Sequence, residues 1–222
     1  MIKLIAILLA AISYQYTNAD ELIERYDPDC LPLFIQGRHG PFDYNTATHG
    51  EKKLVERVHF DEHYQAYRLG KQKLQKKFDH IIETPAAGFS YTLWAFPNHP
   101  AALAAMEDLG SKHQSEKPPG ANLRIHCYFQ RAVKFVPEDP LVRSIYGYYY
   151  ARRNNRLEAL NQLSKAESID NESMSVLVYA AFAYLEIKEY DKALSAAKGA
   201  YQLGYSLPGL RNRLERVGKW KD

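Results

Sequence analysis

A 34-residue spacing runs through the second half of the chain. Three alanines stand at that interval: Ala132, Ala166 and Ala200. The interval also relates small, aromatic and aliphatic positions: Gly147 with Ala181, Ala159 with Ala193, Tyr150 with Tyr184, and Phe135 with Ile169 and Leu203. A period of this length, with small residues at fixed offsets, predicts a repeated unit of two closely packed helices. The fold is therefore expected to be all-α.

The repeat divides the chain into segments. Residues 140–207 are predicted to form two regular repeats of helical hairpins. Residues 59–139 are expected to form looser hairpins of the same kind, with an inserted loop at residues 110–120. Residues 20–58 contain proline and glycine without a helical period, which predicts an irregular N-terminal arm. Residues 208–222 are expected to form a helix that caps the array.

The first nineteen residues have the pattern of an export signal. An early lysine precedes the apolar run Leu4–Ile12, and small residues lead to Ala19. The run is too short to span about 30 Å of hydrocarbon as a helix. We therefore expect residues 1–19 to be a signal peptide that is cleaved after Ala19, leaving a periplasmic protein with no membrane span. The alternative is an uncleaved N-terminus that anchors the chain in the membrane.

The chain contains two cysteines, Cys30 and Cys127. In an oxidising compartment these two residues are candidates for one disulfide that ties the N-terminal arm to the middle of the chain. The alternative is a pair of free thiols, because Cys127 lies in an apolar helical run where a free cysteine packs well.

Several short strings resemble one protein family. They are YTLWAFPNHPAAL at residues 91–103, CYFQRA at 127–132, LPGLRN at 207–212, GKW at 218–220 and GPFDY at 40–44. With the 34-residue period, the chain resembles the tetratricopeptide-repeat superfamily, and within it a group of exported bacterial proteins. The resemblance implies a right-handed solenoid of helical hairpins in the periplasm. It implies no particular activity.

The charge of the chain limits its partners. Lysine and arginine number 29 and aspartate and glutamate 26, so the formal net charge is only +3. Neutralising a nucleic-acid backbone requires a much stronger basic excess. We therefore expect no nucleic-acid partner.

One motif suggests metal chemistry. His59, Glu62 and His63 fit the pattern H-x-x-E-H, in which two histidines on one helix face bind zinc and a glutamate acts as base. No third ligand is recognisable downstream, and no complete set of catalytic residues is present elsewhere. We expect a protein without cofactor or catalytic residues, and keep a metal-dependent enzyme or metal-binding protein centred on these three residues as the alternative.

The first helices of the two regular repeats are expected to line a concave groove that binds a protein or peptide of the cell envelope. The groove-facing offsets fall on Ser144, Tyr148, Arg152, Val178, Phe182 and Glu186. Such aromatic and aliphatic side chains favour a partner with an apolar anchor. In the alternative, the arm fills the groove with Phe34, Phe42 and Tyr44. The sequence thus predicts a non-catalytic scaffold or adaptor, and leaves its oligomeric state open.

Overall fold

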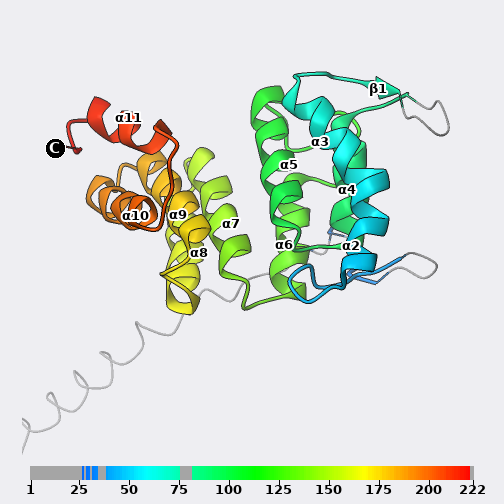
Figure 1. Cartoon of the computed structure of the whole chain (residues 1–222), viewed down its shortest axis with the longest axis horizontal. Coiled ribbons are helices and arrows are strands. Elements are labelled where there is room, and N and C mark those ends of the chain that lie inside the picture. The colour runs from blue at the N-terminus through cyan, green and yellow to red at the C-terminus, as the bar shows by residue number, and fades with distance from the viewer. Residues whose placement is uncertain (1–26, 28, 31, 35–38, 76–81, 221–222) are drawn as a thin grey trace, which may run out of the picture.

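The computed structural model describes residues 27, 29–30, 32–34, 39–75 and 82–220. The expected signal peptide, residues 1–19, lies outside them. The described chain is all-α apart from one two-stranded ribbon (Figure 1). Its first half contains α2 (His49–Val55), the π-helical turn η1 (Glu56–Phe60), α3 (Asp61–Arg68), β1 (Leu74–Gln75), β2 (Ile82–Glu83), α4 (Pro85–Ala95), α5 (Pro100–His113) and α6 (Ile125–Phe135). The two strands are antiparallel, with Leu74 opposite Glu83.

The second half consists of two helical hairpins and a final short helix. Its elements are α7 (Pro140–Arg152), α8 (Arg156–Ile169), α9 (Met174–Glu186), α10 (Tyr190–Gln202) and α11 (Gly209–Arg216). Equivalent helices of the two hairpins start 34 residues apart. Asn154 and Lys188, also 34 residues apart, both have a positive φ in the turn between the helices. The period seen in the sequence is therefore present in the backbone.

Close approach explains the glycine in α7. A Cβ atom on Gly147 would lie 2.8 Å from Leu163 Cδ2 and 3.3 Å from the carbonyl oxygen of Ala159, both on α8. Leu163 and Ala159 are fully buried. A larger side chain at position 147 would push α7 and α8 apart, because protein interiors have little free volume.

Two expected segment boundaries differ from the structure. The irregular arm, expected to run to residue 58, ends at residue 48 because Thr48 caps α2. The Thr48 hydroxyl accepts a hydrogen bond from the Glu51 amide, and the Glu51 carboxylate accepts one from the Thr48 amide. This reciprocal capping box starts a helix where we expected arm. The inserted loop, expected from residue 110, begins after His113, where α5 ends.

The helices pack side by side, so that α7 contacts the helices on both sides of it. It packs against α5 and α6 of the first half and against α8 and α9 of the second (Figure 1). One buried cluster runs from α4 to α7 and a second from α7 to α11. None of the helices in the described residues is long and apolar enough to cross a membrane.

A disulfide joins the arm to α6, as predicted. Cys30 and Cys127 are bonded through their sulfur atoms and both are buried. Close to it, Arg124 Nη2 lies 2.7 Å from the carboxylate of Asp27. The arm is thus fixed to the helical body by a covalent bond and an ion pair.

Candidate functional site

A cavity of about 300 Å³ lies between α3, α5, α7 and α9. Its walls combine tyrosine rings, small apolar side chains and charged groups. The lining residues are Tyr64, Tyr67, Ala101, Ala104, Ala105, Glu107, Asp108, Ile145, Tyr148, Arg152 and Tyr179. The alanines of α5 have small side chains and so leave a space, which tyrosines of α3, α7 and α9 surround.

The residues predicted on α7 divide between this cavity and the core. Tyr148 and Arg152 line the cavity, and the Arg152 guanidinium lies 5.5 Å from the centre of the Tyr148 ring. Ser144 is fully buried and donates a hydrogen bond to the Leu141 carbonyl oxygen, 2.9 Å away. It does not line the cavity.

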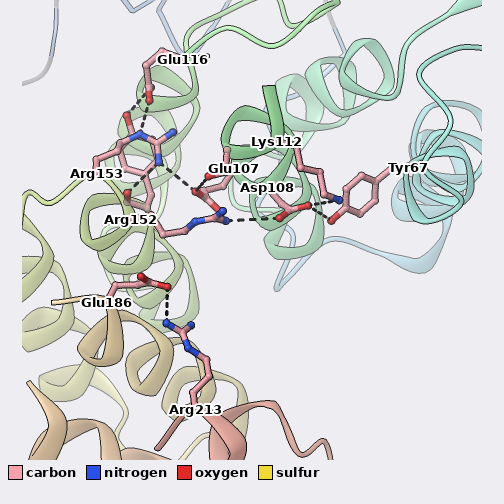
Figure 2. Close-up of polar contacts among 11 residues, drawn as sticks. Tyr67, Glu107, Asp108, Lys112, Glu116, Arg152, Arg153, Glu186 and Arg213 are labelled. Carbon is pink, nitrogen blue, oxygen red and sulfur yellow. Dashed lines mark hydrogen bonds and ion pairs between the residues drawn. The ribbon is translucent and has the colours of Figure 1, made fainter. Parts of the chain in front are cut away.

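The residues predicted on α9 are Val178, Phe182 and Glu186. They lie near the cavity but do not line it. The Phe182 ring is 6.1 Å from the Tyr148 ring, and the half-buried Val178 packs on the same cluster. Glu186 pairs with Arg213 of α11 at 2.9 Å (Figure 2). The Arg213 guanidinium also lies 5.7 Å from the Phe182 ring centre. Through Arg213, α11 therefore contacts two of the residues predicted to line the groove, Phe182 and Glu186.

A buried carboxylate anchors one wall of the cavity. Glu107 of α5 is only 2% exposed, and its oxygens lie 2.9 Å from Arg152 Nη1 and 3.2 Å from Arg153 Nη1 of α7 (Figure 2). Burial raises the pKa of Glu107, and the two arginines oppose that shift. Arg153 also pairs with Glu116, which accepts a hydrogen bond from Tyr149 at 2.7 Å. This network joins α5 and the loop after it to α7.

Asp108, the neighbour of Glu107 on α5, also lines the cavity and lies 3.7 Å from Arg152 Nη1. It accepts a hydrogen bond from the Tyr67 hydroxyl at 2.8 Å and pairs with Lys112 at 2.7 Å (Figure 2). Burial alone would raise the pKa of Asp108, but the contacts with Lys112 and Tyr67 outweigh it and the pKa is lowered. Asp108 is therefore a carboxylate that fixes the Tyr67 ring against the cavity.

Three tyrosine hydroxyls at the cavity have no hydrogen bond to the rest of the described chain: those of Tyr64, Tyr148 and Tyr179. The rings of Tyr148 and Tyr179 lie 6.3 Å apart. Burial, reinforced by Tyr64 and Tyr148, raises the pKa of Tyr179 to about 12. Burial also raises the pKa of Tyr148. The phenols of Tyr148 and Tyr179 are therefore neutral at physiological pH, and all three hydroxyls can donate or accept hydrogen bonds.

Comparison with protein-family models, with curated proteins and with solved structures finds no match.

The described part of the arm packs away from the cavity. Phe42 and Tyr44 contact Phe96 at the end of α4, with ring centres 6.0 and 5.7 Å away. Asn98 accepts a hydrogen bond from the Tyr44 amide at 2.9 Å. Phe34 is 71% exposed. The alternative in which these three aromatic residues fill the groove is therefore wrong.

The histidines of the H-x-x-E-H motif have other partners. His63 is fully buried and its Nε2 lies 2.8 Å from Glu83 of β2. The His59 ring stacks on Tyr91 of α4 at 3.6 Å. Within the described residues, no group of three His, Cys, Asp or Glu side chains, including His59, Glu62 and His63, is arranged to hold a metal ion.

Sequence reasoning missed the residues on the far side of the cavity. Tyr64 and Tyr67 are three residues apart and so share one face of α3. Glu107 and Asp108 are adjacent acids in the apolar run PAALAAMEDL, where a buried charge needs a partner. Both signals were in the sequence, but nothing in it places α3 opposite α7.

Proposed function

We propose that this protein is a non-catalytic interaction module that binds an extended peptide segment of a partner protein in the cavity between α3, α5, α7 and α9. The observation that carries the proposal is the set of hydroxyls on Tyr64, Tyr148 and Tyr179 that make no hydrogen bond within the described residues, at the surface of an aromatic cavity. Tyrosine supplies contact area at low conformational cost, with a polar tip for backbone groups of a bound chain.

The charged walls support binding by a preformed site. Glu107 and Asp108 are both held by ion pairs, with Arg152 and Lys112 respectively. Side chains that are already ordered lose little entropy when a ligand binds. A cavity with an apolar floor and fixed polar groups suits a segment that inserts one apolar or aromatic side chain and hydrogen-bonds through its backbone.

The proposal includes the wider architecture suggested by the repeat. We place α7 to α10 in two tetratricopeptide-like units, preceded by more divergent hairpins in a right-handed solenoid, with α11 as the cap. The 34-residue interval between equivalent helices and the small residue at the α7–α8 contact support this assignment. We also propose export to the periplasm, where the partner would belong to the cell envelope. The Cys30–Cys127 disulfide supports an oxidising compartment.

A selection from a phage-displayed random peptide library tests the peptide site. Immobilised mature protein is expected to enrich peptides that share an apolar anchor residue. The double variant Tyr148→Ala/Tyr179→Ala should bind an enriched peptide about tenfold or more weakly, because aromatic contacts at the centre of an interface are frequent hot spots.

Tyr190→Ala is the matched control, since Tyr190 starts α10 and does not line the cavity. It should leave peptide affinity unchanged. Failure to enrich any peptide family, or equal loss of affinity in the control and the double variant, would contradict the proposed function.

A further inference from the structure

A second cavity, of about 370 Å³, shares Tyr67 with the tyrosine-lined cavity. It is formed by the end of α3, the segment before β1, the start of α4, the end of α5 and the following loop. Its lining residues are Tyr67, Gly70, Lys71, Gln72, Lys73, Thr84, Pro85, Ala86, Leu109, Lys112, His113, Pro118 and Pro119. This volume lies in the range of small-molecule sites.

The charge of this cavity has one sign. Among the described residues, its charged lining side chains are Lys71, Lys73 and Lys112, the imidazole of His113 lies beside them, and no aspartate or glutamate lines it. Lys112 is fixed by its ion pair with Asp108. The side chains of Lys71, Lys73 and His113 make no hydrogen bond or ion pair with the described residues. Two lysines that have no ion pair within the described residues make such a cavity attractive to anions.

The start of α4 adds to the positive potential. Its N-cap residue, Thr84, donates its hydroxyl hydrogen to the Pro119 carbonyl oxygen at 2.8 Å and caps none of the helix amides. The first turn of α4 contains no acidic residue. The partial positive charge of the helix N-terminus is therefore not neutralised by a side chain of its own helix.

The rest of the lining is apolar. Pro85, Ala86 and Leu109 come from helices, and Pro118 and Pro119 from the loop, while the Tyr67 ring forms the wall shared with the other cavity. An inorganic anion would leave this surface in contact with water. A ligand with an apolar body and one anionic head would cover the surface and meet the lysines.

We propose that this cavity binds an amphipathic organic anion, with its carboxylate or phosphate at Lys71 and Lys73 and its alkyl portion on Leu109 and the prolines. The site is separate from the peptide cavity, so either site can exist without the other. The carboxylate and the phosphate are both oxyanions carried on a short apolar chain. The experiment below distinguishes these two headgroups.

Isothermal titration calorimetry of the whole mature chain with octanoate, octyl phosphate and 1-octanol tests the proposal. One or both anions should bind at least about tenfold more tightly than the alcohol, because each lysine contact is a charge-assisted one. The stronger of the two anions identifies the headgroup. Equal binding of the alcohol, or no binding of either anion, would overturn the proposal.

The double variant Lys71→Glu/Lys73→Glu changes two exposed side chains that have no ion pair within the described residues, so the fold should persist, which circular dichroism checks. It should lose about tenfold or more in anion affinity. The control Lys53→Glu/Lys192→Glu makes the same change in net charge at exposed lysines of α2 and α10. An equal loss of anion affinity in the control would show only a general effect of net charge and would overturn the proposed site.

Discussion

The guanidinium of Arg152 on α7 lies 2.9 Å from the carboxylate of Glu107 on α5, and the Glu107 side chain is almost completely buried. This contact links the two halves of the molecule, because α5 belongs to the first buried cluster while α7 also contributes to the second. It also places a charged wall beside the tyrosines. The stability of the body and the shape of the cavity therefore depend on the same pair.

Arg152→Ala is expected to lower the free energy of unfolding by about 1–3 kcal/mol. Within the described residues, the substitution leaves the buried Glu107 carboxylate with Arg153 as its one remaining arginine partner. The control is Arg156→Ala, which removes an exposed pair with Glu189 and should cost less than about 1 kcal/mol. Urea unfolding of both variants measures the difference, and equal costs would contradict the structural role of Glu107.

Gly147→Leu should destabilise the protein by about 2 kcal/mol or more. The added side chain has no room between α7 and α8, since even a Cβ atom would lie 2.8 Å from Leu163 Cδ2. His113→Ala, at an exposed position, should change stability by less than about 0.5 kcal/mol. Thermal unfolding compares the two. Similar melting temperatures would be inconsistent with the close α7–α8 contact.

The second half of the fold was predictable because its helices repeat at a fixed interval. The pairs Gly147 with Ala181 and Ala159 with Ala193 reveal that interval, and all four residues are buried. The first half was less predictable, because its helix starts depend on local hydrogen bonds such as the Thr48 capping box. Helix caps need only two residues and leave a weak signal in a sequence.

The candidate site was predicted only in part for a similar reason. Tyr148 and Arg152 follow from the repeat register, and both line the cavity. Tyr64 and Tyr67 come from a segment outside the period, so the sequence gives no information on which helix they face. Ser144 was misplaced because a small polar side chain satisfied by its own helix can be buried in a core.

The stability of the protein should depend on pH through His99. Its Nδ1 caps α5 by accepting a hydrogen bond from the Ala102 amide at 3.2 Å. Burial lowers the pKa of His99 to about 4, while Glu56, 3.4 Å from Nε2, opposes the shift and Lys52 adds to it. The neutral form is thus favoured in the folded state. Stability from His99 is complete above the unfolded pKa near 6.5 and is lost as the pH falls toward 4.

His99→Asn keeps a residue that caps helices well but does not titrate in this range. Urea unfolding at several pH values should show a weaker pH dependence between 6.5 and 4 in the variant, with a difference of up to roughly 3 kcal/mol. The same pH dependence in both proteins would assign the titration to other groups.

The disulfide should contribute strongly to stability. It closes a loop of 97 residues between Cys30 and Cys127. The variant Cys30→Ser/Cys127→Ser should lose about 2–4 kcal/mol in the free energy of unfolding, because the unfolded chain regains the entropy that the bond removes. Ellman titration of the denatured, unreduced wild type should find no thiol. Two thiols per chain would exclude the bond in solution.

The most direct test of the peptide site is hydrogen–deuterium exchange of the mature chain with and without a peptide enriched by the library selection. We expect slower exchange in α3, α5, α7 and α9, the four helices that line the cavity, with no change in α2 or α10. Protection confined to α2 or α10, with the four cavity helices unchanged, would contradict it.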